Sequence, residues 1–184
     1  KGQAYFAKTA EDARRIVGKI VGSKKSVVKA KSLTGEEIDL RRHLEELGND
    51  VWETDLGELI LQLRDEAPMH ILSPSIHVPK EDVARLFSKL MSRDVPPDIE
   101  LEVVAAREFL RQRYVQADIG ISGANIVSAE TGSMFIIENE GNARLSTGFP
   151  PIHIAVVGIE KLVPTLGESF KVAEVTWRFA QYTV

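Results

Sequence analysis

Hydrophobic and polar positions show two different patterns along this chain, one typical of helices and one typical of strands. In six stretches the apolar residues recur three or four positions apart, which is the spacing of an amphipathic helix, and capping residues such as Thr9 and Asp55 precede some of them. The helices predicted from this spacing span residues 10–22, 34–48, 55–63, 79–90, 98–116 and 167–180.

Short runs rich in Val and Ile lie between these helices and predict strands at residues 26–30, 51–54, 70–72, 118–121, 126–129, 133–138 and 152–157. Strands alternate with helices in the first half, which predicts a parallel sheet covered on both faces. The second half is richer in strands, and we expect one antiparallel pair that turns at residues 139–141. The pattern predicts one three-layer α/β/α domain over residues 1–184, with a mostly parallel sheet whose strand order it leaves open.

The composition favours a globular domain and argues against several other classes of protein. The 184 residues are 43% hydrophobic and 27% charged, which is typical of a globular domain able to bury its own core. The formal net charge of −4 argues against a general nucleic-acid binder. There is no cysteine, so these residues offer no disulfide and no thiolate ligand for a metal or an iron–sulfur cluster.

No apolar run approaches the roughly 20 residues that a membrane-spanning helix needs, and no signal-peptide pattern is visible. We therefore expect a cytoplasmic protein without a membrane span. The chain begins at Lys1 rather than at methionine, so sequence beyond either end is an open question.

The densest group of reactive side chains lies between residues 117 and 165, where polar residues follow or precede the predicted strands. In open α/β sheets, ligands bind at the carboxyl ends of strands, so we predict the working face here. Three residues are candidate catalytic groups: Glu130, Glu140 and His153. The ligand-binding candidates carry amide, hydroxyl, backbone or charged groups: Lys31, Asn125, Thr131, Asn139, Gly141, Asn142, Arg144 and Glu160.

Several of these residues also have a purely structural interpretation. Glu130 could accept backbone hydrogen bonds that fix a turn, the run from Asn139 to Arg144 could form a hairpin turn with a surface ion pair, and His153 could be a hydrogen-bonded core residue. Arg144 is the side chain best suited to grip a carboxylate or phosphate. Asp55 is most simply a helix N-cap.

Several well-known site patterns are absent from the sequence. It holds no Walker loop, no Gly-x-Gly-x-x-Gly motif and no Gly-x-Ser-x-Gly elbow, so ATPase, Rossmann-dehydrogenase and serine-hydrolase interpretations lack support. His70 and His77 flank a proline loop, but no carboxylate–histidine spacing supports a zinc site. We predict no metal site.

The ordered set of short motifs resembles the lactate-utilization (LUD) domain family. The motifs are Lys31-Ser32, residues 53–58 (ETDLGE), 74–77 (PSIH), 117–125 (ADIGISGAN), 129–133 (AETGS), 139–144 (NEGNAR) and 153–161 (HIAVVGIEK). The likeness covers nearly the whole chain and is strongest to the iron–sulfur, LutB-like type. The matching positions include Glu58 and His77 besides the candidates given above, whereas Pro151 stands where many relatives carry a basic residue.

This resemblance implies a fold of the NagB/RpiA/CoA-transferase-like class and a part in oxidising L-lactate to pyruvate, within a cytoplasmic complex of several lactate-utilization subunits. In the LutB-like type, a segment carrying two [4Fe–4S] clusters follows the LUD domain. Because this chain has no cysteine, it resembles only the N-terminal LUD portion. Either iron–sulfur clusters belong to a C-terminal segment missing from this chain, or the chain is a stand-alone domain. The resemblance supplies no catalytic mechanism.

Three functions follow as hypotheses. In the first, the LUD domain binds a small anionic ligand or a redox partner at the strand ends, with Arg144 holding the anion and Glu130 and His153 moving protons. In the second, the chain is an enzyme of the CoA-transferase or sugar-phosphate type, with Glu130 or Glu140 as nucleophile, by analogy of fold alone. In the third, it is a non-catalytic scaffold subunit; a homo-oligomer is compatible with each.

Overall fold

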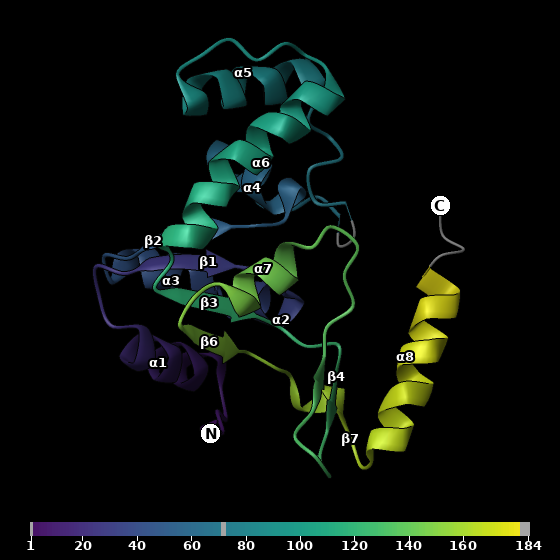
Figure 1. Ribbon diagram of the computed structural model, residues 1–184. Coiled ribbons are helices and arrows are strands. Elements are labelled where there is room, and N and C mark those ends of the chain that lie inside the picture. Colours follow the sequence, from purple (N-terminus) through teal and green to yellow (C-terminus); the bar gives the residue numbers. More distant parts are fainter. Residues whose placement is uncertain (1, 71–72, 181–184) are drawn as a thin grey trace.

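The fold is organised around a parallel sheet of four strands in the order β2-β1-β3-β6 (Figure 1). The computed structural model describes residues 2–70 and 73–180. The strands of this sheet, sheet A, are β1 (Ser26–Lys29), β2 (Asp50–Glu53), β3 (Ile119–Ser122) and β6 (Ile152–Ala155). All three pairings are parallel, so the four carboxyl ends meet at one edge of the sheet.

Helices cover both faces of sheet A, which confirms the predicted three-layer α/β/α architecture. Val27 of β1 faces α1 (Ala10–Val21) and α3 (Leu40–Glu46), whereas its neighbour Val28 faces the core under α4 (Leu56–Arg64) and α6 (Ile99–Gln116). The alternation follows from the two-residue period of a strand. Helix α5 (Lys80–Met91) packs on α6 farther from the sheet.

Helix α7 (Asn142–Gly148) lies unusually close to β3. A Cβ placed on Gly120 would come within 1.7 Å of the carbonyl oxygen of Ser146, so only glycine allows this approach. The Ser146 Oγ lies 3.2 Å from the Thr54 Oγ1 just after β2, and both side chains are buried. Helix α7 is thereby held through Ser146 against β3 and the carboxyl end of β2.

A second, smaller sheet, sheet B, has the order β5-β4-β7 and lies beside sheet A (Figure 1). Its strands are β4 (Ile126–Ser128), β5 (Met134–Phe135) and β7 (Leu162–Val163). The short 3-10 helix η1 (Ile159–Lys161) comes directly before β7. Helix α8 (Leu166–Ala180) packs on this sheet through its first turns, where Phe170 meets Phe135 edge to face.

The antiparallel pair exists, but its predicted turn is wrong. Strand β4 pairs with β5 across the residues 129–133, whereas residues 139–141 lead into α7. An Asn-Glu-Gly sequence serves a helix start as well as a hairpin, because Gly141 takes the left-handed conformation (φ 77°) needed at this boundary. Predicted strand 133–138 shortens accordingly to two residues.

The predicted helix at 34–48 is also corrected. It is two helices, α2 (Leu33–Glu37) and α3, because Asp39 adopts a left-handed backbone (φ 49°) between them. The predicted strand at 70–72 lies largely outside the described residues. Among the described residues, no helix is long and apolar enough to cross a membrane.

Candidate functional site

A buried ion pair stands at the carboxyl ends of the two neighbouring strands β1 and β2. Lys29 and Glu53 are the last residues of these strands and are direct partners in the parallel register. The Lys29 Nζ lies 3.0 Å from the Glu53 Oε1, and their side chains are 1% and 5% exposed. The Arg41 Nε lies 3.7 Å from the same Glu53 oxygen. Burial nevertheless raises the pKa of Glu53, because desolvation disfavours the charged form more than Lys29 and Arg41 favour it.

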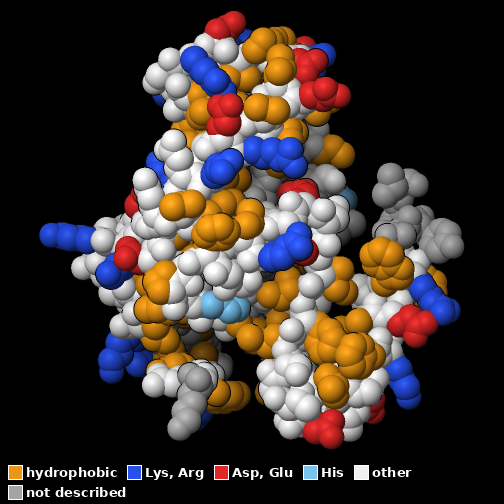
Figure 2. Space-filling view, in the orientation of Figure 1, with side chains coloured by type: hydrophobic (Ala, Val, Ile, Leu, Met, Phe, Trp, Pro, Cys, Tyr) orange, Lys and Arg blue, Asp and Glu red, His pale blue; other side chains and the backbone are white. Residues whose placement is uncertain are grey.

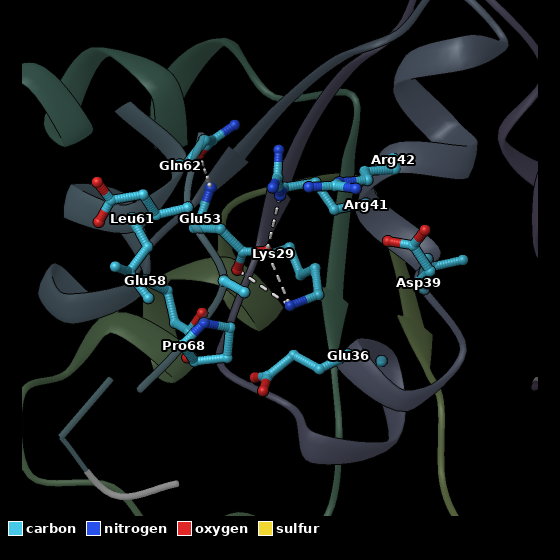
Figure 3. Close-up of a pocket in the computed structure, with 14 residues that line it drawn as sticks. Lys29, Glu36, Asp39, Arg41, Arg42, Glu53, Glu58, Leu61, Gln62 and Pro68 are labelled. Carbon is cyan, nitrogen blue, oxygen red and sulfur yellow. Dashed lines mark hydrogen bonds and ion pairs between the residues drawn. The ribbon is translucent and has the colours of Figure 1, made fainter. Parts of the chain in front are cut away.

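This pair forms one wall of a cavity of about 280 Å³ (Figure 3). Its lining comes from α2, α3, α4 and the loop after α4, and most of it is charged: Glu36, Asp39, Arg41, Arg42, Glu58 and Glu66 join Lys29 and Glu53. The Glu36 Oε1 is buried without a hydrogen-bond partner among the described residues. Charged groups of both signs therefore line the cavity, together with apolar side chains such as Leu40 and Leu61.

Glu58 is a second buried carboxylate in the lining of this cavity. It lies in the first turn of α4, which Asp55 caps by accepting a hydrogen bond from the Glu58 N–H at 3.1 Å. Burial raises the pKa of Glu58 to about 7, with a further rise from the charges of Glu36 and Glu53. Both protonation states are thus populated near neutral pH, as in many proton-transfer groups.

Lys31 lies beside Glu58 and links it to a second carboxylate. The Lys31 Nζ is 3.9 Å from the Glu58 Oε1. The pKa of Glu140 is raised, first by burial and then by the negative charge of Asp55, while the positive charge of Lys31 partly offsets this rise. Lys31, Asp55, Glu58 and Glu140 therefore form one electrostatically coupled group at the carboxyl edge of sheet A, which we call the edge cluster.

Of the candidates near α7, Glu140 is the one whose pKa responds to the charges of Lys31 and Asp55. Arg144 is 80% exposed, and its Nε lies 3.6 Å from the Glu138 Oε1, while its backbone N–H donates to the other oxygen of Glu138. The Asn142 carbonyl accepts a hydrogen bond from the Ser146 Oγ at 2.9 Å. Asn139 and Gly141 lie in the turn that leads into this helix.

Three other candidates organise sheet B. The Asn125 Oδ1 accepts a hydrogen bond from the Ile137 N–H at 2.8 Å, and the Thr131 Oγ1 bonds to the side chain of Ser133. The Glu130 Oε2 accepts a hydrogen bond from the Leu166 N–H at the first residue of α8, at 2.9 Å. A carboxylate in that position stabilises the start of the helix.

His153 occupies another position, inside β6 and next to β3. Its Nε2 lies 2.7 Å from the Ser122 Oγ, and burial lowers the pKa of the imidazole. Glu160 is in η1, where its carboxylate is 62% exposed and 3.6 Å from the Lys161 Nζ. The contacts therefore divide the predicted site residues among the edge cluster, the start of α7, sheet B and β6.

Sequence reasoning missed Lys29, Glu53 and Arg41. The available signal was a charged residue at the end of each of two apolar strands, VVK and VWE, because a charge in a strand buried on both faces needs a partner. His77 bonds to Glu66 at 3.0 Å rather than to His70. No group of three or more His, Asp or Glu side chains in the described part of the chain is placed to hold a metal ion.

The LUD domain family model matches residues 1–183, nearly every position of this chain. The chain belongs to the LUD domain family.

Curated relatives agree with this assignment. The LUD domain is 45% identical over 170 residues to lactate utilization protein B of Shouchella clausii and 42% identical over 170 residues to that of Bacillus subtilis. It is 41% identical over 169 residues to an uncharacterized electron transport protein, YkgF, of Escherichia coli. Each match covers 91% of this chain and 36% of the relative. The chain thus spans little more than a third of these relatives, and no solved structure matches it.

Proposed function

We propose that this LUD domain is the ligand-binding portion of a protein that takes part in oxidising L-lactate to pyruvate. The names of the curated relatives, lactate utilization protein B, support the pathway. The observation that carries the binding role is the edge cluster, in which Lys31 lies next to Glu58 at the border of the charged cavity.

A small hydroxy acid fits the chemistry of the edge cluster. The Lys31 ammonium offers a charge-assisted hydrogen bond to a carboxylate, and such bonds are stronger than neutral ones. Glu58, with a pKa of about 7, can accept the proton of a neighbouring hydroxyl group when it is ionised. Oxidation of the hydroxy acid also removes the α-hydrogen and two electrons, which pass to a redox group outside these residues.

An iron–sulfur cluster does not fit these 184 residues. Thiolate sulfur is the usual ligand of such clusters, and the chain contains no cysteine. We therefore assign the electron acceptor to another part of the polypeptide or to another lactate-utilization subunit, and we assign binding and proton transfer to this domain.

Calorimetric titration with L-lactate, pyruvate and a sugar phosphate tests the proposal. Replacing Lys31 by Met should weaken binding of L-lactate by about 10- to 100-fold, the usual worth of a charged hydrogen bond. Lys161→Met is the matched control, because Lys161 is a 41% exposed lysine paired with Glu160 in η1. Equal affinities in these two variants would remove Lys31 from the site, and the absence of binding in the wild type would refute the ligand class.

Two further variants separate the remaining roles. Glu58→Gln should remove the pH dependence of lactate binding around pH 7, because it abolishes the titration without changing the size of the side chain. Arg144→Ala tests whether an anion is held at the start of α7. Unchanged affinity in Arg144→Ala together with weaker binding in Lys31→Met would place the anion at the edge cluster.

A second function, acyl transfer through a carboxylate nucleophile, is favoured at one residue. Glu140, rather than Glu130, belongs to the edge cluster, since Glu130 caps α8. Incubation with an acyl-CoA followed by intact mass measurement tests this function. A glutamyl adduct lost in Glu140→Gln would support it, and the absence of any adduct would contradict it.

A further inference from the structure

Strand β6 is an edge of sheet A whose outer side has no partner in the described chain. The Val156 N–H donates to the Ser122 carbonyl at 2.8 Å, so alternate residues starting from Ile152 face β3. His153, Ala155 and Val157 consequently present their N–H and C=O groups to the opposite side. Among the described residues, no hydrogen bond joins these backbone groups to another element.

The opposite edge of the same sheet, β2, is protected. The Gln62 side chain of α4 accepts a hydrogen bond from the Glu53 N–H at 3.0 Å and donates one to the Val51 carbonyl at 2.6 Å. A side-chain amide thus occupies the outward backbone groups of β2, which is a common way to block further strand pairing. The contrast indicates that β2 is built as an edge and that β6 is not.

The sequence of β6 and the residues after it is also that of an internal strand. Residues 152–157 (IHIAVV) contain no charged residue and no proline, although these are the usual protections of an exposed edge. Ile154 and Val156 pack into the core beneath α1, while Ile152 remains 47% exposed. Near-continuous apolar runs are typical of parallel strands with neighbours on both sides.

Helix α8 also exposes more apolar surface than is usual for a helix of a folded domain. Four large side chains beyond its first turns are exposed: Val172 (41%), Val175 (55%), Trp177 (59%) and Phe179 (71%). They lie on both flanks of the helix, and the polar strip between them consists of Lys171, Glu174 and Arg178. A helix that is apolar around most of its circumference is ordinarily buried. Figure 2 shows hydrophobic side chains exposed towards the far end of α8, which projects from the body in Figure 1.

We propose that sheet A continues beyond β6 with one more strand, supplied by a part of the same polypeptide outside these 184 residues, and that the same part of the polypeptide covers the apolar surface of α8. The curated relatives offer the necessary length, because the match covers only 36% of each. The added strand would be apolar, to match Ile152 and the exposed side chains of α8.

Hydrogen exchange measured by mass spectrometry tests this proposal on two proteins, the 184-residue chain and the complete gene product that contains it. In the complete product, peptides covering residues 152–157 and 172–179 should exchange at least about tenfold more slowly than in the 184-residue chain. Equal exchange in both proteins would overturn the proposal. So would a 184-residue chain that forms a dimer with β6 already protected, since the partner strand would then come from a second copy.

A pair of substitutions provides an independent readout. Trp177→Ser should lower the thermal midpoint of the complete product while leaving that of the 184-residue chain unchanged, because Trp177 is 59% exposed in the latter. Val115→Ser on α6, at a position that is 66% exposed, is the matched control and should leave the midpoints of both proteins unchanged. An equal effect of Trp177→Ser on both proteins would show that α8 needs no further cover.

Discussion

Removal of the amine of Lys29 should destabilise the fold strongly. In Lys29→Met the aliphatic part of the side chain is retained, but Glu53 loses the ammonium 3.0 Å away while its own side chain remains 5% exposed. A buried charge without its partner costs far more than the net worth of the pair. Arg41, with its Nε 3.7 Å from Glu53, supplies only part of the lost compensation.

The expected size of this effect follows from the burial. Breaking a buried pair by removing one partner costs about 3–5 kcal/mol, and because Arg41 remains near Glu53 we expect the lower end, about 3 kcal/mol at pH 7. The pKa of Glu53 is already raised by burial and should rise further without Lys29. A raised folded-state pKa gives stability that is present below the unfolded pKa and lost as the pH rises, so the deficit of Lys29→Met should shrink towards pH 4.5.

Urea unfolding followed by circular dichroism measures the free energies at both pH values. The control is the double variant Lys29→Met with Glu53→Gln, which removes both charges and should recover at least about half of the loss. If Lys29→Met matches the wild type within about 0.5 kcal/mol at pH 7, or if the double variant is no better than the single one, the buried-pair argument fails.

Three further predictions concern single groups. The pKa of Glu58, raised to about 7, should make the wild type lose stability as the pH rises from 4.5 to 7, and urea titrations of Glu58→Gln should show a flatter profile. Gly120→Ala should lower the free energy of unfolding by about 3 kcal/mol or more, because the new Cβ would lie 1.7 Å from the Ser146 carbonyl oxygen. Gly148→Ala is the control: its new Cβ meets nothing within 4 Å, so the variant should be neutral or stabilising when both are measured by urea unfolding. His153 should titrate below pH 6.5 by NMR, because burial lowers its pKa; a value at or above 6.5 would contradict its burial beside β3.

The layered architecture could be predicted from the sequence because it depends on local periodicity. The buried run at Val27 and Val28 and the cap at Asp55 identify a strand and a helix start without knowledge of the rest of the fold. The split at Asp39 could not be predicted, because a left-handed backbone at an aspartate is decided by the tertiary packing of α2 and α3. The NEG turn failed for the same reason, since α7 is fixed by its contact with Gly120.

The charged cavity shows why the sites of such folds are hard to predict from motifs alone. Reactive residue types are densest after Ala117, yet Glu130 and Asn125 are engaged in holding sheet B and α8 together. Glu58 lies in an ordinary helical turn, and its raised pKa comes first from burial and then from the charges of Glu36, which is distant in the sequence, and of Glu53 at the end of β2.

The proposed ligand site and the proposed added strand are connected through sheet A, because the edge cluster and β6 both belong to this sheet. A proton-transfer group such as Glu58 keeps its raised pKa only while water is excluded, and sheet A is closed by Gln62 at β2 but open at β6. Because β3 carries Ser122 and the adjoining loop that touches Ser32, closing the sheet at β6 would restrain the loops around Lys31. If the complete gene product binds L-lactate more tightly than the 184-residue chain, and Ala155→Pro in β6 abolishes that difference without affecting the 184-residue chain, the added strand and the ligand site are coupled. Equal affinities in the two proteins would show that the edge cluster is already complete within the LUD domain.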